Sequence, residues 1–389
     1  MDLGRDWGVR RSDRAAAAWM SGIIVVTLTV WSVFKSEAGK YIIYTLPLTL
    51  SAAYLYFNDG VVRWYRPAVI SLGLYLACAL TAMLVNSWYD FLAVRDVAII
   101  GGYLFLFTLW FRAPASTADF CLFVLAVGMV IEAVVDGVGE SVDLFGSNGI
   151  LESTLAFPIG VVMLYYLHSG QRGRAVLAGI LLFLAFKRIT FVGVVLAAGL
   201  DFVLFNRYMP RALARVSAVC LVLTLSMAAV FSSEIFAFVA TWLDLPATTA
   251  NGISLGRHDI ATRLWGGLNT RSFVGWLFGA GPGAADAVVI ASDAGLQNPH
   301  NDWLKVLYDY GIIGFIVVHM VLYRTLTEHR LGLMLYVYGA TLMMTDNIFI
   351  YMFYHPFVML MLSAARRAPG EAMQPARSTV PAVAAPGAL

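Results

Sequence analysis

Histidine and arginine residues beside apolar segments are the positions where this sequence could carry chemistry. His300 lies in the segment Asn-Pro-His-Asn-Asp (298–302), directly before an apolar run that begins at Trp303. Because a histidine titrates near neutral pH, it can serve as a general base. A lone histidine at the start of a helix is more often structural, so both interpretations stay open. Pro299 and Asn301 are typical of a helix start, which places His300 just ahead of the first turn.

The cations that could accompany His300 fall in two places. Lys187 and Arg188 form nearly the whole connection between two apolar runs, whereas Arg257, Arg263 and Arg271 lie in the long polar stretch 233–302. A guanidinium group matches the geometry of a phosphate better than an ammonium does. These cations therefore suggest a site for an anionic ligand. Ordinary snorkelling of long side chains at helix ends is the alternative interpretation.

Two further patterns mark the stretch 233–302. The apolar spacing over 259–268 predicts a short amphipathic helix, with Ile260 and Leu264 on one face and Arg263 elsewhere. The segment Phe-Gly-Ala-Gly-Pro-Gly (278–283) is a glycine-rich turn. As a phosphate cradle it is a weak signal, because no strand precedes it and no Lys-Ser/Thr pair follows. A tight turn that returns the chain to the membrane is an equal alternative.

The composition indicates which elements must position these residues. Of 389 residues, 60% are hydrophobic and 13% are charged, whereas a soluble globular chain carries about 25% charged residues. The scattered Lys and Arg residues exclude a nucleic-acid-binding face. We therefore predict an all-α, polytopic membrane protein of about twelve transmembrane helices. The predicted spans lie near 17–35, 41–57, 67–85, 95–111, 119–135, 151–167, 173–186, 189–206, 212–232, 303–323, 331–345 and 348–364.

The distribution of arginine predicts which side each connection faces. Arginines gather in alternate connections, for example at Arg63 and Arg66, which favours an even number of spans with both termini in the cytoplasm. The loop 233–302 then lies outside. We expect a cytoplasmic N-terminus (1–16), a membrane domain (17–364) and a disordered cytoplasmic tail (365–389). His355, near the middle of the last span, either faces a cavity for a lipid carrier or makes an internal hydrogen bond.

Four features in order resemble the superfamily of O-antigen ligases and O-antigen polymerases. The first two are a cation at an outer helix end (Arg188) and a Gly-Arg pair (256–257) followed by Trp265. The third is the turn at 278–283. The last is His300-Asn301 followed by Gly311 and Gly314, with nine residues between Asn301 and Gly311 and two between the glycines. The resemblance runs from about residue 180 to 350, and the twelve-helix topology extends it over the whole chain.

This resemblance implies an inverting glycosyltransferase with a GT-C-like fold in the bacterial inner membrane. Such enzymes take a glycan from undecaprenyl diphosphate at the periplasmic face and pass it to an acceptor hydroxyl, without cofactor or metal. His300 would activate that hydroxyl. Arg188 and Arg257 would hold the diphosphate, and Lys187, Arg263 and Arg271 are second-rank candidates for the same anion. Membrane lipid and other polysaccharide-assembly proteins are the remaining expected partners.

Departures from the family pattern affect the choice within it. Some ligases carry an Arg-x3-Leu in this loop, but here Ala261 stands four residues after Arg257. We therefore lean to a polysaccharide polymerase over a ligase that joins glycan to lipid A-core. The rival from another class is a transporter or lipid flippase, which predicts internal repeats, broken helices and charged residues at mid-membrane. The sequence shows no repeats, and most of the outer cations gather at one face. A non-catalytic assembly partner is a third interpretation, and it would leave His300 replaceable.

Overall fold

The computed structural model describes residues 10–34, 44–57, 63–136, 153–204, 210–243, 257–292, 299–349, 351 and 353–366. Within these residues the protein is helical, and its only extended pairing is an isolated bridge between Trp64 and Leu109. The all-α prediction is therefore confirmed for the part of the chain that is described. The expected tail, apart from 365–366, and the start of the expected N-terminal segment (1–9) lie outside the described residues.

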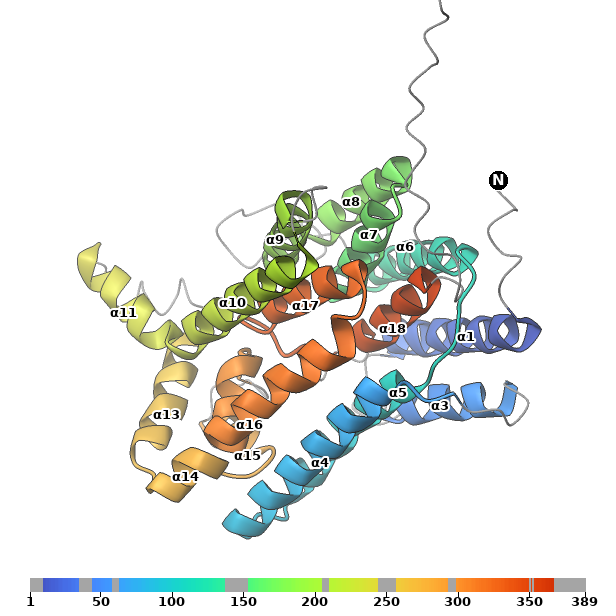
Figure 1. The fold of residues 1–389 in the computed structure, drawn as a ribbon. Coiled ribbons are helices and arrows are strands. Elements are labelled where there is room, and N and C mark those ends of the chain that lie inside the picture. The colour runs from blue at the N-terminus through green and yellow to red at the C-terminus, as the bar shows by residue number, and fades with distance from the viewer. Residues whose placement is uncertain are drawn as a thin grey trace, which may run out of the picture.

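The helices form an elongated bundle with a group of short helices at one end (Figure 1). We refer to the end that carries α11, α13, α14 and α15 as the loop end. The helices are α1 (Arg11–Phe34), α3 (Leu46–Phe57), α4 (Arg66–Asn86), α5 (Phe91–Thr108), α6 (Ser116–Asp136), α7 (Ala156–His168), α8 (Arg172–Ala185), α9 (Arg188–Leu204), α10 (Arg211–Val230), α11 (Ser232–Trp242), α13 (Arg257–Asn269), α14 (Phe273–Phe278), α15 (Ala284–Ile290), α16 (Asp302–Leu326), α17 (Arg330–Leu342) and α18 (Tyr354–Ala365).

A helix lies at each of the twelve predicted spans. Among the described residues, α1, α4, α5, α6, α10 and α16 are long and apolar enough to cross a membrane. The helices α3, α7 and α18 are apolar but shorter. These are features of a multi-pass membrane protein. The count of twelve spans, the GT-C-like architecture and the side on which the loop end lies stay predictions.

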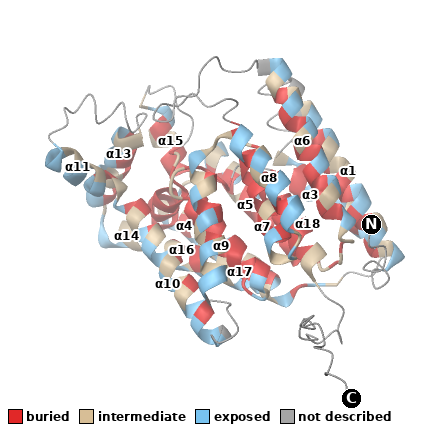
Figure 2. Cartoon of the chain, turned by 90° about the horizontal axis from the view of Figure 1, so that it is seen from above, coloured by how far each residue is buried: buried red, intermediate tan, exposed pale blue. Residues whose placement is uncertain are grey.

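Burial divides the bundle into a centre and a rim (Figure 2). Almost every residue of α17 is buried, and α18 and the first half of α16 are enclosed in the same way. The rim helices instead expose large apolar side chains, such as Leu223 and Met227 on α10. An apolar face of this kind is stable when lipid covers it. The buried centre therefore fixes the positions of α16 and α17, against which the polar groups of the loop end are placed.

Helix α16 is broken at Gly311, which has a φ of 66°. The break separates a first half, Asp302–Tyr310, from a second half that continues through the bundle. A break within a membrane protein leaves backbone carbonyls that need new partners. The segment 278–283 supplies them, because the backbone N–H of Ala280 donates to Tyr308 O at 2.9 Å and that of Gly281 to Asp309 O at 2.9 Å.

Candidate active site

A cavity of about 450 Å³ opens at the loop end. It lies between the start of α9, helices α11 and α13, the start of α16 and the turn that follows α17. Among the described residues that line it, three carry fixed positive charges and one is a carboxylate, so the cavity favours an anionic ligand. These four are Lys187, Arg188, Arg257 and Asp346, and the other polar side chains that line the cavity are Ser232, Ser233, His258, His300, Asn301 and Thr345.

The connection between α8 and α9 brings Lys187 and Arg188 into the cavity. Helix α8 ends at Ala185, and Phe186 adopts a left-handed conformation with φ 44°, which turns the chain sharply. Arg188 then begins α9 and is exposed, as the sequence predicted for a short connection. Lys187 is more enclosed, with its Nζ 5.7 Å from the centre of the Phe157 ring. The two cations therefore occupy one wall of the cavity.

Helix α13 forms a second wall and carries Arg257 as its first residue. Ile260 and Leu264 are buried, whereas Arg263 is exposed on the opposite face, so the predicted amphipathic helix is confirmed. The preceding Gly256 lies outside the described residues. Because the apolar face holds α13 against the bundle, the position of Arg257 depends on that packing. Arg257 and Arg188 thus reach the same cavity from helices that are far apart in the sequence.

His300 lines the cavity and lies one residue before Asn301, the N-cap of α16. Asn301 accepts a hydrogen bond from the N–H of Leu304 at 3.0 Å, which caps the helix as predicted. Its amide also donates to Ala229 O at 2.8 Å, which joins the end of α10 to the start of α16. His300 itself has a φ of 51°, a conformation that costs energy for a residue other than glycine. Such strained residues cluster at functional sites.

Asp346 is the carboxylate that contacts both Lys187 and His300. Its Oδ2 lies 3.3 Å from Lys187 Nζ, and its Oδ1 lies 3.8 Å from His300 Nδ1. Burial opposes ionisation of this carboxyl group. The contacts with His300, Lys187 and the hydroxyl of Tyr351 outweigh burial, so the pKa of Asp346 is held below its ordinary value. Asp346 is therefore ionised at neutral pH, next to the ring nitrogen of the candidate base.

Comparison with protein families identifies the part of the chain that builds this cavity. Residues 173–319 match the family model described as O-antigen ligase. This part of the chain is therefore similar to O-antigen ligases. No curated protein matches the chain. The matched segment contains Lys187, Arg188, Arg257 and His300, whereas Asp346 lies beyond it. The superfamily that the sequence pattern resembles is thus supported by an independent comparison.

Asp346 was not among the site residues predicted from the sequence. At the turn between two predicted spans, an Asp-Asn pair suggests an ordinary helix cap. The structure instead ties this turn to α16: Asp302 N–H donates to Met343 O at 3.0 Å, and Asp302 Oδ2 accepts from Phe349 N–H at 3.1 Å. A paired carboxylate often orients a histidine base. Asp346, which follows His300 by 46 residues, was the sequence signal available for such a partner.

Two of the cations predicted from the sequence lie away from this cavity. Arg263 is exposed on α13, and it does not line the cavity. Arg271 stacks on the ring of Tyr308, with 4.0 Å between its Cζ and the ring centroid, and donates to Tyr308 O at 3.0 Å. Arg271 therefore supports the broken part of α16. The structure brings together Lys187, Arg188, Arg257 and His300 but not these two arginines.

The glycine-rich turn at 278–283 binds protein backbone, which corrects the suggestion of a phosphate cradle. The N–H groups of Ala280 and Gly281 are bonded to carbonyls of α16, and those of Gly283 and Ala285 donate to the Asp309 carboxylate. A Cβ at Gly279 would lie 2.3 Å from Asp309 O, so only glycine permits this approach. The turn therefore holds α14 and α15 against the first half of α16.

His355 lies apart from the cavity that contains His300. Its Nε2 lies 3.1 Å from Ile348 O, and its ring is 4.5 Å from that of Tyr103. It lines a small apolar cavity of about 50 Å³ at the centre of the bundle. The internal hydrogen bond is observed, with the turn before α18 as the partner, and His355 also lines a cavity; a role of that cavity in receiving a lipid carrier stays a prediction.

Proposed function

We propose that this protein transfers glycan from a lipid diphosphate carrier to an acceptor hydroxyl at the periplasmic face of the bacterial inner membrane. The observation that carries the proposal is the meeting of Arg188, Arg257, Lys187 and His300 in one cavity, all from the segment that is similar to O-antigen ligases. Undecaprenyl diphosphate is the proposed carrier, and a growing glycan or lipid A-core is the proposed acceptor. Three fixed cations beside one candidate base suit a reaction in which an anion leaves and a hydroxyl attacks.

His300 is the proposed general base. The acceptor hydroxyl would lose its proton to the imidazole as its oxygen attacks the anomeric carbon, and the carbon–oxygen bond to the diphosphate would break on the opposite face. Attack from the opposite face inverts the configuration at that carbon. The nearby Asp346 carboxylate, 3.8 Å from Nδ1, would stabilise the imidazolium that forms. Asp346 remains the partner of Lys187 in this scheme.

Arg188 and Arg257 are the proposed ligands of the departing diphosphate, with Lys187 beside them. Charge grows on the bridging oxygen as the glycosidic bond breaks, and cations fixed in advance stabilise it without reorganisation. The guanidinium groups can each make two parallel hydrogen bonds to phosphate oxygens. They approach from α9 and α13, so the diphosphate would be held between two walls of the cavity.

Within this class of reaction we favour a polymerase, because Ala261 replaces the Leu of the ligase pattern four residues after Arg257. A ligase that joins glycan to lipid A-core is the second candidate, since the matching family model is described as O-antigen ligase. The lipid-linked intermediates distinguish them. Loss of a polymerase accumulates single repeat units on the carrier, whereas loss of a ligase accumulates long chains there.

The test is a His300→Ala variant in a strain that lacks the native gene, scored for long-chain polysaccharide and for lipid-linked glycan. We expect surface polysaccharide to be lost while the protein reaches normal levels in the membrane. Normal polysaccharide made by His300→Ala would exclude His300 as the base. Normal lipid-linked glycan on the outer leaflet, together with loss of transfer, separates a transferase from a flippase, since a flippase defect would leave the glycan inside.

A further inference from the structure

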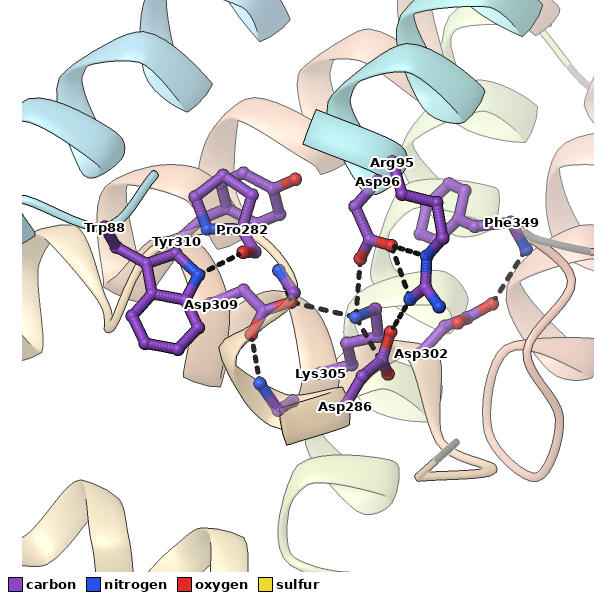
Figure 3. Close-up of polar contacts among 12 residues, drawn as sticks. Trp88, Arg95, Asp96, Pro282, Asp286, Asp302, Lys305, Asp309, Tyr310 and Phe349 are labelled. Carbon is purple, nitrogen blue, oxygen red and sulfur yellow. Dashed lines mark hydrogen bonds and ion pairs between the residues drawn. The ribbon is translucent and has the colours of Figure 1, made fainter. Parts of the chain in front are cut away.

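Five charged side chains are buried together at the loop end, outside the candidate active site. Lys305 lies at the centre: its Nζ is 2.7 Å from Asp96 Oδ2, 3.1 Å from Asp286 Oδ1 and 3.0 Å from Asp309 Oδ2 (Figure 3). Arg95 pairs with Asp96 at 2.8 Å and also contacts Asp286. We call these five residues the buried charge cluster. None of them lines the cavity that contains His300.

The buried charge cluster joins three elements that are distant in the sequence. Arg95 and Asp96 belong to α5, Asp286 to α15, and Lys305 and Asp309 to the first half of α16. The carboxylates are almost fully buried, and the Lys305 side chain is 5% exposed. Burial raises the pKa of Asp286, although the charge of Lys305 opposes that rise. The cluster therefore depends on Lys305 to compensate carboxylates that lie side by side.

A cluster of this kind contributes little to the stability of the fold, although it buries five charges. Replacing buried ion pairs with apolar side chains of similar volume is often neutral or stabilising, because desolvation offsets the attraction. The benefit of a buried pair is instead that it permits few alternative arrangements. Here the arrangement that it selects is the docking of α15, and the turn before it, on the first half of α16. Asp309 contributes to the same docking, since it accepts from the N–H groups of Gly283 and Ala285.

The first half of α16 also carries the N-cap beside His300. The N–H of Lys305 donates to Asn301 O at 3.0 Å, so the central lysine lies one helical turn from Asn301. The break at Gly311 uncouples this half-helix from the rest of α16. The position of this half-helix must then come from contacts with neighbouring elements. Lys305 supplies two of them, to Asp96 on α5 and to Asp286 on α15.

From this arrangement we infer that the buried charge cluster positions His300. Lys305 and Asp286 are positioning residues: they hold the first half of α16 so that the imidazole faces the cavity. This inference rests on the proposed function only for the consequence in catalysis. The position of His300 can be measured without any glycan substrate, so the two can fail separately.

The substrate-free experiment uses a thiol in place of the imidazole. His300→Cys is made in full-length protein in which Cys78, Cys121 and Cys220 are replaced by alanine, and labelling by a membrane-impermeant maleimide is timed. Adding Lys305→Met or Asp286→Asn should change the labelling rate by about tenfold, because the half-helix loses its lateral anchor. The matched control is Arg330→Met, which removes the pair with Asp201 at the opposite end of α9 and should leave the rate unchanged.

The catalytic experiment uses the same variants with His300 restored. Lys305→Met should lower kcat by about a hundredfold with less than about a threefold change in the KM for the lipid-linked donor, because misplaced groups lose rate before affinity. The double variant Lys305→Met/Asp286→Asn restores the net charge of the cluster, so protein yield should recover, but kcat should stay low because the lateral contacts are still missing. A purely structural role would change protein yield and both constants together. If Lys305→Met does not accumulate, Asp286→Asn decides.

Two results would overturn the inference. One is an unchanged labelling rate of the His300→Cys thiol in the cluster variant that accumulates. The other is a kcat that the charge-balanced double variant restores to the wild-type value, because the loss would then come from an unpaired buried charge and not from the position of His300. A further combination is a changed labelling rate of the His300→Cys thiol in the cluster variants while the wild-type protein shows no glycan transfer. That combination would support the positioning role and reject the proposed function.

Discussion

At the scale of single residues, Asp346 connects the candidate base with the proposed anion site. It contacts Lys187, a proposed ligand of the leaving group, and His300, the proposed base, through its two carboxylate oxygens. One carboxylate thus relates the two halves of the reaction to each other. Since it is buried and ionised, its removal leaves Lys187 without this partner as well as removing the charge beside the imidazole.

The depressed pKa of Asp346 predicts a pH dependence of stability. A carboxyl group whose pKa is lower in the folded protein contributes stability above its unfolded pKa, and this contribution is lost as pH falls through the folded value. We therefore expect the thermal midpoint in detergent to be lower for Asp346→Asn than for the wild type by a constant amount from about pH 5 to 8. The difference should shrink as the pH falls below about 4 and should vanish only below the folded pKa of Asp346, which is lower still.

The control for this measurement is Asp201→Asn, which breaks the more exposed pair with Arg330 and should change the midpoint little at any pH. A difference for Asp346→Asn that grows as the pH falls below 5 would contradict the assignment of Asp346 as an ionised partner.

Two arginines on the same helix provide a matched pair for the diphosphate site. Arg257 lines the cavity, whereas Arg263 is exposed six residues later on α13. We expect Arg257→Ala to lower the transfer rate by about a hundredfold, since removing one preorganised donor costs a factor of this size. Arg263→Ala should stay within about twofold of the wild type, because an exposed charge contributes little. Equal losses in an assay of lipid-linked donor consumption would reject the placement of the diphosphate.

At the scale of elements, the break in α16 determines how the loop end meets the bundle. Gly311 has a positive φ, and a Cβ there would lie 2.5 Å from both Gly279 N and Leu277 O. Gly311→Ala should therefore lower the thermal midpoint of the purified protein, with a cost of about 1–3 kcal/mol for the backbone strain alone. The control is Gly73→Ala on α4, where a Cβ meets no atom within 4 Å and the helix should gain stability. A thermal midpoint for Gly311→Ala at or above that of Gly73→Ala would show that the fold does not require the close approach of the 278–283 turn to Gly311.

The elements could be predicted from the sequence more fully than the contacts between them. Long apolar runs and the cap at Asn301 are local signals, so a helix lies at each expected span and α16 begins beside His300. The break at Gly311 was missed because its apolar pattern continues on both sides. The buried charge cluster was missed because its members come from three separate segments, and each looks like a snorkelling charge. Lys305 and Asp309, four residues apart inside an apolar run, are the local sign that was available.

The same contrast holds for the candidate active site. The types and spacing of Arg188, Arg257 and His300 indicated an anion site with a base, and the structure brings them to one cavity. Residue type alone could not rank the cations, since Arg271 differs from Arg257 only in what surrounds it: its guanidinium stacks on Tyr308. Long-range packing decides which cation faces the ligand, and no local pattern reports it.

At the scale of the whole molecule, the proposed reaction requires the loop end to lie outside the cytoplasm. A single crossing by α16 would place the connection between α16 and α17 on the opposite side from α14. Ser272, the N-cap of α14, and Glu328, between α16 and α17, are both exposed and suit a test. In a background without cysteine, Ser272→Cys should react with an impermeant maleimide in spheroplasts, whereas Glu328→Cys should react only after permeabilisation. The arginine distribution favours this orientation, because positive charge is retained in the cytoplasm. Labelling of Glu328→Cys in intact spheroplasts would reverse the topology and leave the diphosphate cavity facing the wrong compartment for periplasmic transfer.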